Sequence, residues 1–177
     1  MSYDLHLFYL PDGANPAEVY RQLQDKEEQK LLNLDAGQHR PPQQGKLEKM
    51  QALADSLKSC CPAFEQFQPG RPLPWIELTE ENLQLQVTIQ EDMVSISMPY
   101  FRERSAEMMN LAGKCIEALT NEGGFVAYDP QLERIVRVND LSDALTQYHD
   151  MDRHLPDMIA AASREKTRVR RPWWKIW

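Results

Sequence analysis

Hydrophobic and polar residues alternate along several short stretches of the chain, which indicates strands of a sheet with one buried face. The stretch from Tyr3 to Leu10 alternates and ends at a Pro-Asp-Gly turn. Alternation returns over 83–89 and over 94–98, and the four polar or turn residues between these stretches predict a hairpin. Further strands are expected at 125–128 and 135–138.

Other stretches repeat their apolar residues every three or four positions, which is the period of an amphipathic helix. One helix is expected from Pro16 to about Leu34, with Asn15 as its N-cap. A second is expected over about 46–60 and a third over about 102–120. A last helix is expected to begin after Asn139 or Asp140. The proline-rich stretch from 62 to 75 is expected to be an irregular connection.

The order of these elements is β-α-α-β-β-α-β-β-α, which points to an α+β domain. Without one inserted helix and the terminal additions, it becomes β-α-β-β-α-β, the split βαβ arrangement of ferredoxin-like folds. We therefore predict an antiparallel sheet with helices on one face, plus an inserted helix, a C-terminal helix and a tail. The expected organisation is one domain over 1–163 followed by a basic, Trp-rich tail over 164–177.

Charge is divided unevenly along the chain. The net charge is −7, yet the last 14 residues carry six lysines and arginines against one glutamate, so that residues 1–163 hold about −12. Such an acidic body repels nucleic acid and attracts a basic protein surface. We expect the partner to be met by carboxylates of the first helix, of the segment before the hairpin and of the hairpin tip. These are Asp25, Glu27, Glu28, Glu80, Glu81, Glu91 and Asp92.

The tail interleaves cations with tryptophans, a composition that supports three different contacts. It can fold back on the acidic body, dock on a partner protein, or bind nucleic acid or a membrane surface. Folding back is the simplest of the three, because the body itself supplies carboxylates. The residues expected to make the contact are Arg168, Arg170, Arg171, Trp173, Trp174 and Trp177.

The chain offers few groups at spacings that bind metals or catalyse reactions. Cys60 and Cys61 are adjacent and lack the two-residue spacer of CxxC sites, and Cys115 falls on the apolar stripe of the third helix. His149 and His154 are five residues apart and do not share a helix face. We therefore expect no metal and no cofactor, thiols in a reducing compartment, and buried packing for Cys115.

Two alternatives to a protein-binding role stay open. In the first, the open face of the sheet holds a ligand or a small active site, lined by Gln86, Thr88, Ser95 and Ser97, and His6 on the opening strand is the candidate for acid–base work. In the second, the chain is an adaptor that docks through its Trp-rich tail. No apolar run reaches the length of about 20 residues that spans a bilayer, and no export signal opens the chain, so we expect a cytoplasmic protein.

Three short segments resemble a group of small bacterial proteins. They are Tyr3-Asp4-Leu5 with Phe8, the segment from Gly124 to Gln131 that contains a Tyr-Asp-Pro-Gln turn, and the closing Pro172-Trp173-Trp174-Lys175. Several proteins of this group resemble immunity proteins encoded beside polymorphic or contact-delivered toxins. The resemblance implies a ferredoxin-like domain that inhibits a cognate toxin, and it brings no catalytic residues. The leading hypothesis is therefore a non-enzymatic, immunity-type inhibitor.

Overall fold

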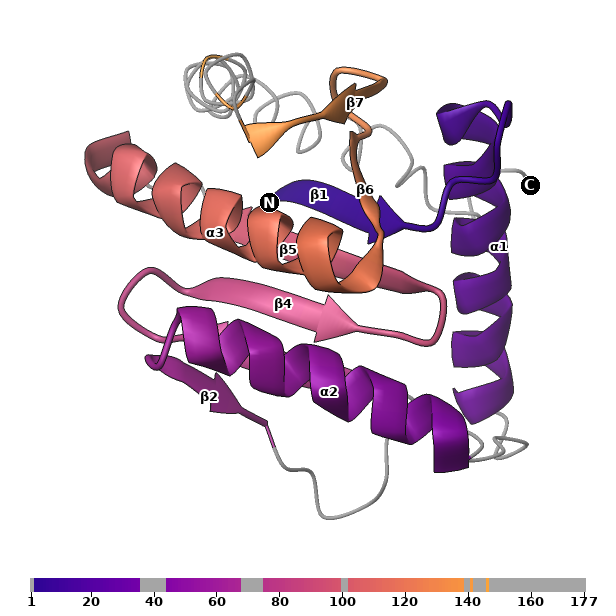
Figure 1. Cartoon of the computed structure of the whole chain (residues 1–177), viewed down its shortest axis with the longest axis horizontal. Coiled ribbons are helices and arrows are strands. Elements are labelled where there is room, and N and C mark those ends of the chain that lie inside the picture. Colours follow the sequence, from indigo (N-terminus) through magenta and orange to yellow (C-terminus); the bar gives the residue numbers. More distant parts are fainter. Residues whose placement is uncertain are drawn as a thin grey trace, which may run out of the picture.

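The computed structural model of the chain describes residues 2–35, 44–67, 75–99, 102–138, 141 and 146. Within these ranges, seven strands form one antiparallel sheet, and three α-helices pack against it (Figure 1). The predicted α+β class with an antiparallel sheet is confirmed. The last predicted helix and the basic tail lie outside the described residues.

The strands lie side by side in the order β2-β3-β4-β5-β1-β6-β7, and each neighbouring pair is antiparallel. β1 therefore lies between β5 and β6 and joins the two halves of the sheet. The bounds of the strands are β1 Ser2–Phe8, β2 Phe64–Gln66, β3 Ile76–Glu80, β4 Leu85–Ile89, β5 Met93–Pro99, β6 Val126–Asp129 and β7 Arg134–Val136.

The helices begin and end close to the predicted positions. They are α1 Pro16–Asp35, α2 Gln44–Cys60 and α3 Ser105–Gly123, with a short 3-10 helix, η1, at Arg102–Arg104. Asn15 caps α1 as predicted, because its side-chain Oδ1 accepts the N–H of Ala17 at 2.9 Å. α3 ends where Gly124 adopts a φ of 65° and donates its N–H to the carbonyl oxygen of Thr120 at 3.1 Å. Residues with a side chain rarely adopt that conformation.

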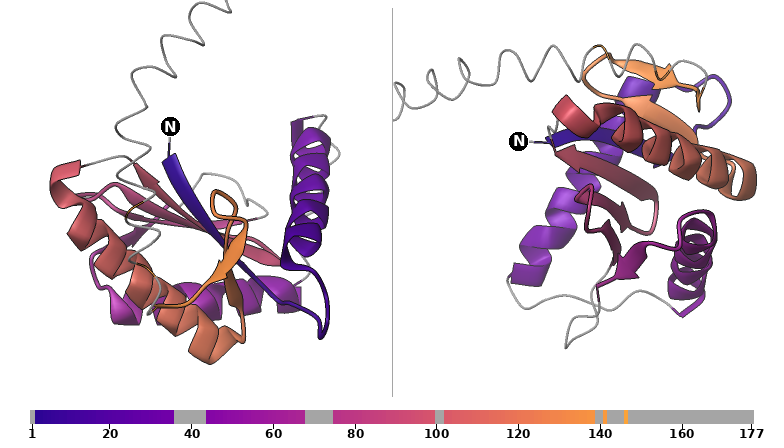
Figure 2. Two further views of the ribbon diagram at one scale, coloured as in Figure 1. Left: turned by 90° about the horizontal axis from the view of Figure 1, so that it is seen from above. Right: turned by 90° about the vertical axis from the view of Figure 1, so that its left-hand side faces the viewer.

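Apolar side chains are buried on both faces of the sheet. α2 and α3 cover one face, where Leu5 and Leu7 of β1 belong to the main core, and α1 lies against the opposite face (Figure 2). There Phe8, Met93 and Tyr128 pack with Tyr20 of α1 in a second, smaller core. Successive residues of a strand point to opposite faces, so β1 contributes to both cores.

The expectation of an irregular connection over 62–75 is wrong at β2, which pairs with β3 along Phe64–Gln66. β3 itself was outside the predicted strands, although Ile76, Leu78 and Glu80 are buried in alternation with half-buried residues. With β2, β3 and β7, the sheet is larger than the sheet of the predicted β-α-β-β-α-β core. None of the helices in the described ranges combines the length and the apolar character needed to cross a bilayer.

Candidate functional site

The hairpin between β4 and β5 carries two of the predicted partner-binding carboxylates at its tip, and both form ion pairs within the chain. Asp92 accepts a hydrogen bond from Lys26 of α1. Glu91 forms ion pairs with Lys46 of α2 and with Lys30 of α1, the latter with 3.7 Å between Lys30 Nζ and Glu91 Oε2. The acidic tip is therefore partly neutralised and joins the two helices to the sheet.

Glu27 belongs to the same network. It is 9% exposed, and its Oε1 lies 2.6 Å from Nζ of Lys30, one helical turn away on α1. Glu27, Glu91 and Asp92 thus lie together, as the prediction of an acidic partner-binding surface requires. However, they form ion pairs with Lys26, Lys30 and Lys46. We call this group of six side chains the lysine–carboxylate network.

Glu80 at the end of β3 is buried and caps a turn. Its Oε2 accepts the N–H of Leu83 at 2.6 Å, and its Oε1 accepts the Nδ2 amide of Asn82 at 3.1 Å. A carboxylate used in this way stabilises the turn between β3 and β4. The neighbouring Glu81 is exposed. Only one member of this predicted pair is therefore on the surface.

The outward side of α1 carries the remaining predicted carboxylates. Asp25 and Glu28 are exposed, and so is Glu18, which lies seven residues before Asp25 and therefore on the same side of the helix. In the part of the chain that the structure describes, these three carboxylates form no ion pair. Arg21 is an exposed cation on the same helix. Glu18 was not among the predicted site residues, although its spacing from Asp25 was a usable signal.

The face of the sheet opposite α2 and α3 carries two cross-strand rows of polar residues. Thr88, Ser95 and His6 are aligned across β4, β5 and β1 in one row. Gln86, Ser97 and Asp4 are aligned in the next row. All six are half-buried. The four residues proposed for a ligand site are therefore brought together on one face, where α1 covers one end.

His6 makes two contacts on this face. Its Nδ1 lies 2.9 Å from Oγ of Ser95, and its ring packs against Tyr20 of α1 with 4.7 Å between ring centroids. Tyr20 also contacts the ring of Tyr128, at a centroid distance of 5.2 Å. The aromatic rings therefore hold α1 on the sheet directly over the imidazole.

This covered position changes the acidity of both rings. Burial lowers the pKa of His6 from 6.5 to about 4, and the negative charge of Asp4 opposes the shift only in part. Burial, with the charges of Asp4 and Tyr128, raises the pKa of Tyr20 to about 12. His6 is thus a neutral imidazole near pH 7. Its ring can accept a hydrogen bond from Ser95 or donate one to it, but it lacks the second ring proton that an imidazolium gives up as a general acid.

The two inner segments of the family resemblance meet in space. The hydroxyl of Tyr3 on β1 donates to Oδ2 of Asp129, which ends β6, and both residues are fully buried. Oδ1 of Asp129 accepts the N–H groups of Gln131 at 2.8 Å and of Leu132 at 3.1 Å. The Tyr-Asp-Pro-Gln turn is therefore fixed to the first strand through one carboxylate, which is a structural role.

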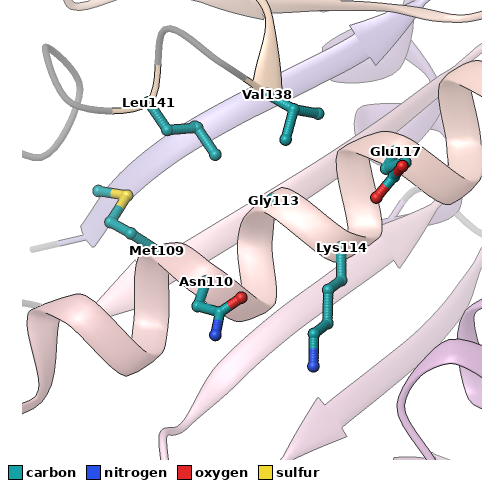
Figure 3. A pocket seen from close by; sticks show the side chains of 7 residues that line it. All are labelled: Met109, Asn110, Gly113, Lys114, Glu117, Val138 and Leu141. Carbon is teal, nitrogen blue, oxygen red and sulfur yellow. The ribbon is translucent and has the colours of Figure 1, made fainter.

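Two cavities lie beside α3. One has a volume of about 320 Å³ and lies between α3 and the segment after β7, where Val138 and Leu141 face Gly113 (Figure 3). A Cβ added at Gly113 would lie 2.9 Å from Leu141 Cδ1, the end of a flexible side chain, so a larger residue here would push that side chain aside. The other has a volume of about 390 Å³ and lies between the first half of α3 and the end of α2.

Several predictions concern residues that the structure does not describe. The tail residues Arg168, Arg170, Arg171, Trp173, Trp174 and Trp177 are among them, as are His149 and His154. Among the residues that are described, no three His, Cys, Asp or Glu side chains are grouped so that they could hold a metal ion. Comparison with known protein families, with curated proteins and with solved structures found no match to this chain.

Proposed function

We propose that this chain is a non-enzymatic binding protein of the immunity type, which engages a basic partner such as a cognate toxin through the outward side of α1. The observation that carries the proposal is the contrast between two sets of carboxylates. Those at the hairpin tip are ion-paired within the chain, whereas Asp25, Glu28 and Glu18 are exposed on one helix without such pairs among the described residues.

Electrostatics supports this choice of surface. A basic partner must displace a lysine before it reaches Glu91 or Asp92, but it meets Asp25 and Glu28 directly. Exposed carboxylates of this kind speed association and select partners more than they add affinity. The lysine–carboxylate network then has a supporting role, because it holds α1 on the body while its outward side meets the partner.

The proposal is tested by two matched variants that change the net charge equally. Asp25→Lys with Glu28→Lys alters the proposed surface. Glu65→Lys with Glu117→Lys alters two exposed carboxylates on β2 and α3. Each protein is purified with the products of the neighbouring genes at low and at moderate salt. Loss of complex only with the α1 variant supports the proposal. Equal loss with both variants points to a general field effect, and no complex with wild type contradicts the proposal.

The polar rows of the second sheet face support an alternative, a module that binds a small polar ligand near Ser97 and Gln86. Half-buried polar side chains with cross-strand neighbours are suited to hydrogen-bonding such a ligand. Mass spectrometry of the protein purified under native conditions would detect a retained compound. Its loss in Ser97→Leu, a change directed at this face, would favour the module over the partner-binding role.

We also propose that the four central strands, β4-β5-β1-β6, form a ferredoxin-like core. Their order, their antiparallel pairing and the two helices α2 and α3 on one face support this assignment. On this interpretation α1 is the inserted helix, and β2, β3 and β7 extend the sheet at its edges. The cytoplasmic location and the roles of the tail remain proposals of the same kind.

A further inference from the structure

Cys115 is far from Cys60 and Cys61 in sequence, yet it meets them where the end of α2 packs against α3. Cys60 is the last residue of α2 and is exposed, and Cys61 follows it half-buried against the main core. Cys115 is fully buried in the middle of α3. The structure holds all three as thiols.

The contact between Cys60 and Cys115 is direct. Their side chains form a hydrogen bond, while the Sγ of Cys60 also lies 3.1 Å from the carbonyl oxygen of Leu57. The backbone N–H of Cys61 donates to the same carbonyl oxygen at 2.9 Å, which fixes the end of the helix. A thiol on the surface is thereby held against a thiol in the core.

Solvent reaches this place from one side. The cavity of about 390 Å³ borders Cys61, and its wall includes Lys114, the neighbour of Cys115 on α3. Lys114 is exposed, and its positive charge favours a thiolate nearby. A small polar oxidant can therefore approach the end of α2 without unfolding the core.

The two thiols differ in reactivity. The hydrogen bond that the Cys115 thiol donates to Cys60 and the burial of Cys115 both raise the pKa of Cys115 well above its ordinary value, so Cys115 stays a thiol. An exposed thiol ionises and reacts more readily than a buried one. Cys60 is therefore placed to react first, and Cys115 to react second.

We propose that Cys60 and Cys115 form a reversible disulfide when the protein meets a peroxide. The sulfur of Cys60 attacks one peroxide oxygen, the O–O bond breaks, and the released hydroxide takes the Cys60 proton to leave as water. The sulfur of Cys115 then attacks the sulfenic acid on Cys60. An S–S bond forms, the S–O bond breaks, and the hydroxyl leaves as a second water with the Cys115 proton. Two thiols are oxidised and one peroxide is reduced.

The test uses the full chain, reduced, freed of reductant and treated with hydrogen peroxide. We expect the intact mass to fall by two hydrogens, two thiols per chain to become unreactive toward a thiol reagent, and both effects to be reversed by dithiothreitol. Cys60 and Cys61 fall in one tryptic peptide, so two variants assign the bond. Cys61→Ser should keep the link, and Cys60→Ser, a change at an exposed position, should lose it.

Three results would overturn the proposal. The first is oxygen added at Cys60 with no link. The second is a link that survives in Cys60→Ser, which would place the bond at Cys61. The third is a link that joins two chains, seen as a dimer on a non-reducing gel. The same reaction in urea is the control for the fold, because equally fast and equally selective linkage of the unfolded chain would show that the packing of α2 on α3 does not direct it.

Discussion

Replacing His6 with asparagine tests the packing of α1 on the second face of the sheet. Asparagine retains a polar atom near the position of Nδ1, which lies 2.9 Å from Ser95 Oγ, but it cannot take up a proton. The variant therefore removes one titration and leaves the hydrogen bond possible. Loss of the ring contact with Tyr20 lowers stability at every pH, so the titration of His6 is measured by the change in the pH dependence of stability.

The size of the effect follows from the lowered pKa of His6. The unfolded chain binds a proton at this residue with a pKa near 6.5, and the folded protein with a pKa of about 4. As the pH falls through this window, the unfolded state takes up the proton first, so stability decreases. At about 1.4 kcal/mol per pKa unit, the loss approaches about 3 kcal/mol below pH 4 and is about 2.5 kcal/mol at pH 4.5.

Urea denaturation of wild type and His6→Asn at pH 7 and at pH 4.5 measures this loss. The carboxylates titrate in both proteins, so the quantity of interest is the difference between the two pH dependences. We expect wild type to lose about 2.5 kcal/mol more than the variant. Parallel losses, within about 0.5 kcal/mol, would refute the reasoning, because His6 would then be as hydrated in the folded protein as in the unfolded chain.

Three other changes, one of them with a matched glycine control, test features elsewhere. Tyr3→Phe removes the hydroxyl that donates to buried Asp129 and is expected to cost about 1–3 kcal/mol in urea denaturation; an unchanged midpoint would mean that the turn alone satisfies the carboxylate. Glu91→Gln breaks half-exposed ion pairs and is expected to cost at most about 1 kcal/mol, less at high salt; a salt-independent cost would contradict an ionic origin. Gly124→Ala, at a φ of 65°, is expected to cost about 1 kcal/mol in thermal unfolding, whereas Gly45→Ala in α2, with open space around its Cα, should be neutral or stabilising.

The periodic elements could be predicted because their signals are local. Alternation over β4 and β5 and the three-to-four-residue spacing in α3 both gave the correct element, and the buried position of Cys115 followed from the same spacing. Asn15 was predicted as a cap from its residue type and its place before Pro16. Each of these inferences depends on residues within a few positions of one another.

β3 shows how a local signal can be obscured. Ile76 and Leu78 alternate with polar residues, but Glu80 at the third inward position suggests a solvent-facing segment. The structure resolves this conflict by giving the carboxylate two donors in the next turn. The burial of Glu80 therefore depends on the geometry of the β3–β4 turn, which forms only when β3 and β4 pair.

The state of the acidic site could not be predicted, because it depends on contacts between distant residues. In the sequence, Glu91 and Asp92 are far from any lysine that could neutralise them. In the folded chain, their carboxylates lie next to Lys26, Lys30 and Lys46. Nothing in the spacing of these residues indicates that α1 and α2 both reach the hairpin tip. The meeting of Cys60 with Cys115 is hidden for the same reason.

β1 leaves the ribosome before the two strands with which it pairs, since β5 and β6 follow roughly 90 and 120 residues later. Until Val126–Asp129 has been synthesised, β1 can pair only with β5. The edge of β1 that later pairs with β6 is then left unpaired. Such edges recruit other chains. We therefore expect nascent or truncated forms that end before β6 to depend on chaperones and to aggregate, and the intact chain to fold more slowly than a helical protein of equal length.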